Sequence, residues 1–144
     1  MLELNSYFKA VSSELYADKN RWETTQIGRG IDTHVNENFP NIKFAEIAIF
    51  NVAEYEGSKN SASDNDCKVR TSFYSFHHDN LPRIADLGVF QLLPTRKESF
   101  SLIQKVCKEL LHHGIIPVIN GPPSANIYTP ICSFLMLDIC YHFS

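Results

Sequence analysis

The side chains that most resemble a metal-binding motif are Asp32, His34 and Asn36. On a β-strand these alternating residues would share one face, and carboxylate and imidazole groups together suit a manganese ion. The neighbouring Gly30 and Asn38 are residues typical of turns and loops. We therefore favour a polar loop, in which Asp32 and His34 are decoys rather than metal ligands.

Histidines form two further groups, His77-His78-Asp79 and His112-His113. Adjacent residues of a helix point about 100° apart, so neighbouring histidines on a helix cannot close on one ion. Cations near the carboxyl end of a helix are favoured by the helix dipole. Helix ends therefore explain both groups without a metal site.

Asp86 is the remaining candidate for catalysis, because it lies near the end of the short predicted strand 83–88. It could equally cap the following loop, and the sequence indicates no partner for it, so we favour a structural role. The sequence contains no Ser/His/Asp elbow, glycine-rich dinucleotide loop or phosphate-binding loop. Residues 121–124, Gly-Pro-Pro-Ser, are too rich in proline to present a row of backbone amides to a phosphate.

Three strands are expected to position these groups. Residues 44–52 are almost continuously apolar and rich in β-branched and aromatic side chains, which is typical of a parallel strand covered on both faces. The segments 83–88 and 115–120 give two more strands. Pro117 has no backbone N–H, so we expect pairing of the last strand to begin after it.

The helices expected between these strands have recognisable ends. A polar loop over 56–66 leads into a helix over 67–76, which Asp64 or Asp66 would cap.

Thr95 and Glu98 have the spacing of a capping box at the start of a second helix. Gly114 is expected to end that helix, because glycine adopts a positive φ without a side-chain clash. Residues 4–22 show a weaker helical periodicity.

This order of elements predicts an α/β fold. The 144 residues are expected to form a single domain, with a helical and loop extension over 1–43 and a βαβαβ core over 44–121. Because crossovers between parallel strands are right-handed, the expected architecture is a partial three-layer αβα arrangement with a mostly parallel sheet. Ligands of such sheets bind beyond the carboxyl ends of the strands, here in the loops after Val52, Gly88 and Asn120.

Residues 122–144 form an apolar segment. Between Ser124 and Ser144 only Asp138 is charged, and 131–137 is an uninterrupted run without charge. The run is too short to span a bilayer, which takes about 20 residues, so no membrane partner is expected. It suits an element buried against more protein, so we expect an incomplete, truncated domain or a homo-oligomer formed through this segment.

The composition argues against several classes of protein. The net charge of −3 argues against a nucleic-acid partner, since charge-driven nucleic-acid binders carry a basic stripe. The four cysteines are widely spaced, so we expect buried thiols in a reducing compartment rather than disulfides or a zinc site. The first residues lack the features of a secretory signal, and the expected location is the cytoplasm.

Several segments follow one another in an order that resembles the amino-terminal part of a known family. They are Glu37-Asn38-Phe39-Pro40, the strand at 47–52, Val69-Arg70 with Phe73-Tyr74, Ile84-Ala85-Asp86-Leu87-Gly88, and Glu109-Leu110-Leu111 with Gly114 to Ile119. Over roughly residues 37–123, the chain resembles the arginase/agmatinase/formimidoylglutamase superfamily, the ureohydrolases. The most similar branch is the divergent bacterial one labelled formimidoylglutamase or arginase-like.

The resemblance implies an arginase-like fold and hydrolysis of a guanidino or formimino carbon–nitrogen bond by a hydroxide that bridges two manganese ions. The family's ligands are a His after a Gly-Gly turn, an Asp-x-His-x-Asp strand end and a late Asp-x-Asp. Alignment of residues 117–121 on the family's strand and turn puts Ser124 where the first His ligand would fall. The other motifs would lie beyond the last residue, and the group at 32–36 precedes the first expected strand.

The resemblance therefore predicts the amino-terminal portion of a manganese-dependent ureohydrolase. This chain would hold no catalytic or metal-ligating residue and would be inactive alone. The implied cofactor is manganese and the implied substrate is a small guanidino or formimino compound, whose identity these residues do not specify. The alternative is a non-catalytic α/β binding or assembly module.

Overall fold

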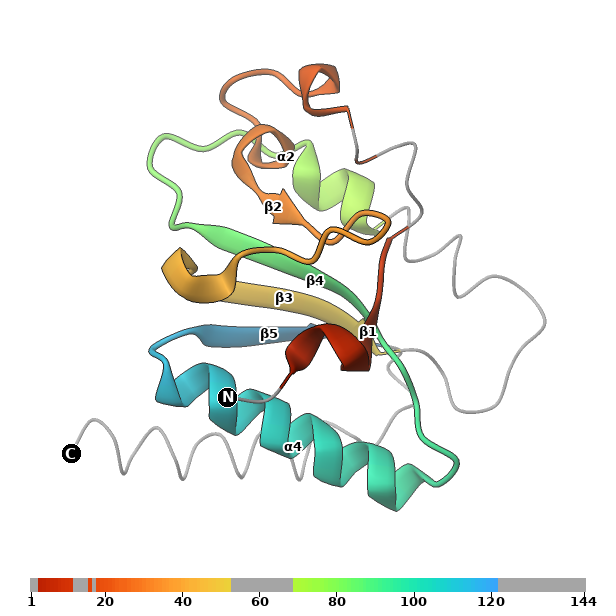
Figure 1. Cartoon of the computed structure of the whole chain (residues 1–144). Coiled ribbons are helices and arrows are strands. Elements are labelled where there is room, and N and C mark those ends of the chain that lie inside the picture. The colour runs from red at the N-terminus through yellow and green to blue at the C-terminus, as the bar shows by residue number, and fades with distance from the viewer. Residues whose placement is uncertain (1–2, 12–15, 17, 53–68, 122–144) are drawn as a thin grey trace.

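Three adjacent parallel strands form most of the sheet in the computed structural model, which describes residues 3–11, 16, 18–52 and 69–121. The strands are β3 (Ile47–Val52), β4 (Ile84–Phe90) and β5 (Ile116–Asn120). They lie side by side in the order β4-β3-β5, as Figure 1 shows. The predicted α/β class and the predicted parallel strands are confirmed.

The outer edge of β4 carries two short strands from the amino-terminal part of the chain. β2 (Asp32–Thr33) pairs parallel with the first half of β4, and β1 (Phe8–Lys9) pairs antiparallel with its end. The five-stranded sheet is therefore mixed. Because β1 and β2 precede β3, the expectation that the sheet begins at residue 44 is wrong.

No continuous helix forms over 4–22 in the described residues, although Tyr16 is helical. The chain instead makes a short 3-10 turn η1 (Leu4–Tyr7), strand β1, a second 3-10 turn η2 (Lys19–Arg21) and, beyond the expected range, a single helical turn α2 (Ile27–Gly30). The apolar side chains are used for tertiary contacts: the Phe8 ring lies 5.2 Å from that of Phe50 and 5.8 Å from that of Phe90. Packing of these rings outweighs a weak helical periodicity.

β3 begins later and β4 ends later than the sequence indicates. Residues Ile42–Phe44 form the 3-10 turn η3, whose Lys43 amide donates to the Asn41 side chain. β4 continues past Gly88 to Phe90. Gly88 has φ +94°, and a Cβ atom there would lie 2.1 Å from the carbonyl oxygen of Lys9. The glycine therefore permits the close approach of β1 rather than ending the strand.

Helix α4 (Arg96–His112) connects β4 to β5 as expected. The Thr95 hydroxyl accepts from the Glu98 amide and donates to the Glu98 carboxylate, so the carboxylate binds the hydroxyl instead of the expected backbone amide. Gly114, with φ +74°, lies just after the helix. Its lack of a side chain allows the chain to turn into β5.

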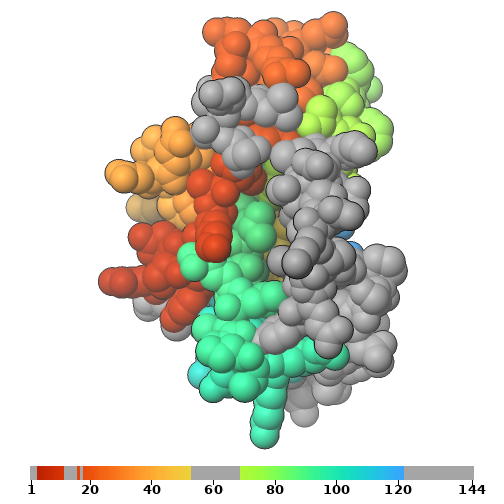
Figure 2. Space-filling view, turned by 90° about the vertical axis from the view of Figure 1, so that its right-hand side faces the viewer, coloured from red at the N-terminus to blue at the C-terminus, as the bar shows by residue number. Residues whose placement is uncertain are grey.

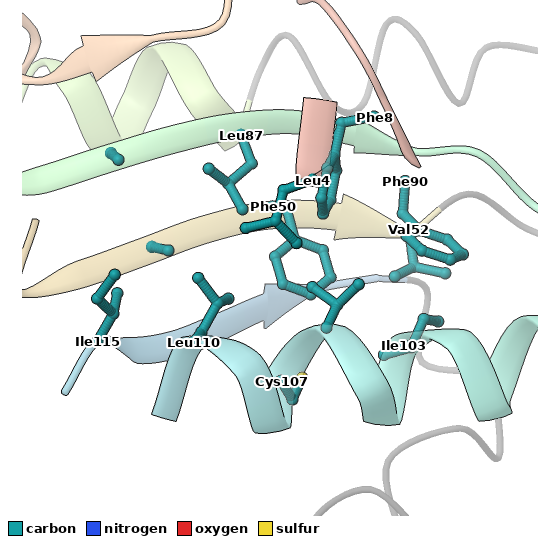
Figure 3. Packing of buried hydrophobic residues seen from close by; sticks show 13 residues of the cluster. Leu4, Phe8, Phe50, Val52, Leu87, Phe90, Ile103, Cys107, Leu110 and Ile115 are labelled. Carbon is teal, nitrogen blue, oxygen red and sulfur yellow. The ribbon is translucent and has the colours of Figure 1, made fainter. Parts of the chain in front are cut away.

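The two faces of β3 contact different hydrophobic clusters. Phe50 and Val52 point toward α4 and pack with its buried side chains (Figure 3), and Ala48 belongs to the same cluster. Ile47 and Ile49 point to the opposite face, where Tyr74 of the helix at 69–74 is buried. This alternation, one residue to each face, places helices on both sides of the sheet.

β5 lies at the edge of the described sheet, and Pro117 does not delay its pairing. The Ile116 amide already donates to the Glu46 carbonyl, and Pro117 lies opposite Ala48. Alternate amides of a strand point to opposite sides, so the amide that Pro117 lacks would point away from β3. The expectation that pairing begins after Pro117 is therefore wrong.

Figure 2 views the molecule from the side toward which β3 runs, where the amino-terminal residues (red) and the first turns of α4 (green) reach the surface. No helix among the described residues is long and apolar enough to cross a membrane. The apolar segment 122–144 and the loop expected over 56–66 lie outside the described residues, as do Asp64 and Asp66.

Candidate functional site

A buried ion pair joins the helix at 69–74 to the centre of the sheet. Arg70 donates to Asp86 through Nε, at 2.6 Å, and through Nη2, at 2.8 Å. The side chains of Arg70 and Asp86 are 5% and 0% exposed. Two parallel charge-assisted hydrogen bonds fix both distance and orientation, so this pair locks the helix onto β4.

Asp86 accepts from two further donors. Its Oδ2 receives the Tyr74 hydroxyl at 2.7 Å, and its Oδ1 receives the Gly88 amide at 3.0 Å. The Tyr74 hydroxyl also lies 2.7 Å from the Thr33 hydroxyl. Both carboxylate oxygens thus accept two hydrogen bonds each, which is what a carboxylate without exposure to water requires.

Burial and the charge of Asp86 change the pKa values of the two side chains that face it, Arg70 and Tyr74. Burial raises the pKa of the Tyr74 hydroxyl, and the adjacent Asp86 charge raises it further. Burial would lower the pKa of Arg70, but the hydrogen bond and charge of Asp86 outweigh it and raise that pKa. Arg70 is therefore a permanent cation and Tyr74 a permanent hydrogen-bond donor over the physiological pH range.

Next to this ion pair lies a cavity of about 180 Å³. Its floor comes from β3 and β5, and its wall comes from the helix at 69–74. The lining residues are Ile49, Asn51, Val69, Arg70, Phe73, Val118 and Asn120. The walls are thus mostly apolar, with two carboxamides and one arginine among them.

The cavity lies where the strand order reverses. The chain passes from β3 to β4 through the helix at 69–74, and from β4 back across β3 to β5 through α4 on the opposite face. In open parallel sheets this reversal leaves a crevice at the carboxyl ends of the two strands, where ligands bind. Asn51 and Asn120 are register partners at those ends of β3 and β5.

Asn51 has an unusual environment for a polar residue in an apolar strand. Its side chain is 6% exposed, and its Nδ2 atom is buried without a hydrogen-bond partner among the described residues. Because Asn51 follows Ile49 by two positions, both side chains lie on the cavity face of β3. A buried donor without a partner carries a free-energy penalty, and groups of this kind are often functional.

The structure does not bring Asp32, His34 and Asn36 together as metal ligands. Asp32 is exposed and accepts from the Asn41 amide, whereas His34 is buried with Nδ1 2.9 Å from the Leu87 carbonyl oxygen. Asn36 has φ +53° and occupies a turn. No group of three His, Cys, Asp or Glu side chains among the described residues is placed to hold a metal ion.

The histidines lie at different places. His112 and His113 lie at the end of α4, where His113 Nε2 is 3.2 Å from Glu109. His77 and His78 lie beyond the helix at 69–74, not within it, and the His77 ring contacts the Thr25 hydroxyl. Ser124 lies outside the described residues.

Two features of this region do not follow from the sequence. The sequence indicates no partner for Asp86 and places it near a strand end, but Asp86 lies within β4 and pairs with Arg70. The four-residue spacing of Arg70 and Tyr74 would place both on one helix face, which signals a common partner. Asn51 is identifiable as the single amide in the almost continuously apolar predicted strand 44–52.

Comparison of the chain with family models, with curated proteins and with solved structures gives no match.

Proposed function

We propose that this chain is the amino-terminal part of a ureohydrolase of the arginase, agmatinase and formimidoylglutamase type. In this proposal it supplies part of a three-layer, arginase-like scaffold, and the catalytic ions are held by residues outside it. The substrate is a small guanidino or formimino compound, and the protein acts in the cytoplasm.

The observation that carries the proposal is the contact between segments that resemble the family. Arg70 and Tyr74 belong to one such segment and Asp86 to another, and the two segments are joined by the ion pair and by the Tyr74 hydrogen bond. Two other such segments form the paired parallel strands β3 and β5. Segments that resemble a family in order are expected to contact one another if they belong to one inherited scaffold.

The described residues do not fit the two manganese ions of that family. Asp86 is the one fully buried carboxylate among them, and its two oxygens already accept from Arg70, Tyr74 and Gly88. Asp32 and His34 bind different backbone groups, Asp32 the Asn41 amide and His34 the Leu87 carbonyl. We therefore assign no step of a hydrolytic reaction to the described residues.

The gene tests the family assignment. We expect the nucleotide sequence directly downstream of this chain to encode an Asp-x-His-x-Asp run in one of its reading frames, followed by a later Asp-x-Asp. A downstream sequence without either motif in any frame would contradict the proposal.

The second candidate is a non-catalytic α/β binding or assembly module, and the cavity beside Asn51 favours it. Analytical ultracentrifugation distinguishes the two functions. A stable oligomer of defined stoichiometry, dispersed by charged substitutions within 131–137, supports the module. A monomer that self-associates without a defined stoichiometry supports the ureohydrolase part.

A further inference from the structure

We propose that Asn120 is a site of spontaneous covalent modification, at which water converts the side-chain amide to a carboxylate through a cyclic imide. This inference rests on the end of β5, and it does not depend on the ureohydrolase function proposed above.

Asn120 and Gly121 form the only Asn-Gly pair in the sequence. The backbone nitrogen that follows an asparagine can attack the side-chain carbonyl carbon, and glycine hinders this attack least because it has no Cβ. Every other asparagine precedes a residue with a side chain. The sequence therefore singles out this pair, and the fold determines whether the attack is possible in the native chain.

The Asn120 side chain is open to water. Asn120 is exposed, and no hydrogen bond joins its carboxamide to another of the described residues. Water can therefore reach the carbon that loses ammonia, which is also the carbon that is later hydrolysed.

The Gly121 amide is positioned on the open side of β5. The Ile116 amide points toward β3, where it donates to the Glu46 carbonyl, and Asn120 lies opposite Asn51 in the same register. Since alternate amides of a strand point to opposite sides, the Gly121 amide points away from β3. It donates to no backbone carbonyl in the described part of the chain. No hydrogen bond within that part has to break before this nitrogen attacks.

The backbone at Asn120 can rearrange because β5 ends there. Ring closure requires rotation about the Cα–C bond, and the terminal residue of a strand opens at little cost to the rest of the fold. Asn51 is the contrast within the same molecule: it is paired on both sides, with Val89 and with Asn120, and the attacking nitrogen would belong to the buried, β-branched Val52. We therefore expect modification at Asn120 and none at Asn51 in the folded chain.

The reaction needs water as its only co-reactant, and nothing is oxidised or reduced. The Gly121 nitrogen loses its proton to a base in the solvent and bonds to Cγ of Asn120. The Cγ–Nδ2 bond then breaks, and Nδ2 takes up a proton and leaves as ammonia. Water opens the imide at Cγ to give aspartate, or at the main-chain carbonyl to give isoaspartate. Either product places a negative charge beside the cavity that Asn120 lines.

The test is incubation of the full chain at pH 8 and 37 °C, folded or unfolded in guanidinium chloride, followed by peptide mass spectrometry. We expect residue 120 of the folded chain to gain the mass that distinguishes aspartate from asparagine, at a rate within about tenfold of that in the unfolded chain. Asn51 should keep its mass in the folded chain. A folded rate at Asn120 outside that tenfold range, or an equal rate at Asn51, would overturn the proposal.

Substitutions then test the imide route. G121A adds a Cβ beside the attacking nitrogen and should slow the reaction at least about tenfold. N120Q keeps the carboxamide but would have to close a larger ring, so it should abolish the mass gain. N20Q makes the same exchange at an exposed position that precedes an arginine, and it should leave the rate at Asn120 unchanged. A rate that G121A does not alter would refute the route. If G121A does not fold by circular dichroism, N120Q and the comparison of folded with unfolded chain decide the result.

Discussion

Replacement of Asp86 by Asn should remove a large part of the folding free energy, because the new amide cannot satisfy the groups around it. Each carboxylate oxygen accepts from two donors: Oδ2 from Arg70 Nε and the Tyr74 hydroxyl, and Oδ1 from Arg70 Nη2 and the Gly88 amide. Whichever way the Asn amide turns, its NH2 group faces one Arg70 N–H and one other donor. The substitution also leaves the Arg70 charge buried without a counterion.

Removal of one partner from a buried ion pair costs about 3–5 kcal/mol. Here the added donor–donor conflict argues for the upper half of that range, about 4 kcal/mol. The free energy of unfolding of a small domain is about 5–15 kcal/mol in total, so D86N should lose roughly a quarter to four fifths of it. Urea unfolding followed by circular dichroism at 222 nm measures the loss.

The exposed pair Arg83–Glu46 is the matched control. Its Nε–Oε2 distance is 3.5 Å, and its side chains are 67% and 53% exposed. E46Q makes a comparable acid-to-amide exchange, but solvent screens this pair, so its effect should be much smaller than that of D86N.

The double variant R70M/D86L removes both charges together, so it should be less destabilised than the sum of R70M and D86L. A D86N loss below about 1 kcal/mol, or strictly additive single substitutions, would refute the reasoning that this ion pair locks the helix to the sheet.

Three further predictions follow from individual side chains. G88A should destabilise the fold by more than about 2 kcal/mol, because its Cβ would clash with the Lys9 carbonyl oxygen and because residue 88 has a φ of +94°. The control G30A has nothing within 4 Å of its Cβ and should be neutral in the same unfolding assay. Because the pKa of the Tyr74 hydroxyl is raised in the folded state, its protonated form stabilises the fold; this stabilisation is complete below pH ~10 and is lost as the pH rises above that value. Y74F lacks the hydroxyl, so its free energy of unfolding should fall less than that of the wild type between pH 9 and 11. An equal fall in the two proteins would contradict this. Burial raises the pKa of Cys107 to about 12, so iodoacetamide at pH 8 should alkylate it only in urea, as read by peptide mass spectrometry, and alkylation in the native state would show that the thiol is accessible.

The sequence predicts those parts of the fold whose pattern is local. The helix start at Thr95 and the glycine at 114 depend on neighbours within one or two turns, and both were predicted correctly, although Glu98 binds the Thr95 hydroxyl rather than a backbone amide. The amino-terminal part was predicted incorrectly, since Phe8 packs against Phe50 and Phe90, which are distant in the sequence. A periodicity count contains no information on such contacts.

The candidate site depends on the same kind of distant contact. Arg70 and Asp86 are separated by 16 residues, and nothing local to either residue identifies the other as its partner. The sequence predicts ligand binding at the carboxyl ends of the parallel strands, and the cavity lies beside those ends of β3 and β5. This location could be predicted because strand order and crossover handedness determine where such a crevice forms. That Asn51 lines the cavity with a buried donor became evident only when the register of β3 and β5 was known.

The proposal that this chain supplies scaffold rather than the ion centre is tested most directly by isothermal titration calorimetry of the folded chain with Mn²⁺ at neutral pH. The account predicts no stoichiometric heat of tight binding. A site of submicromolar dissociation constant at one or two ions per chain, accompanied by hydrolysis of a guanidino or formimino compound, would contradict it.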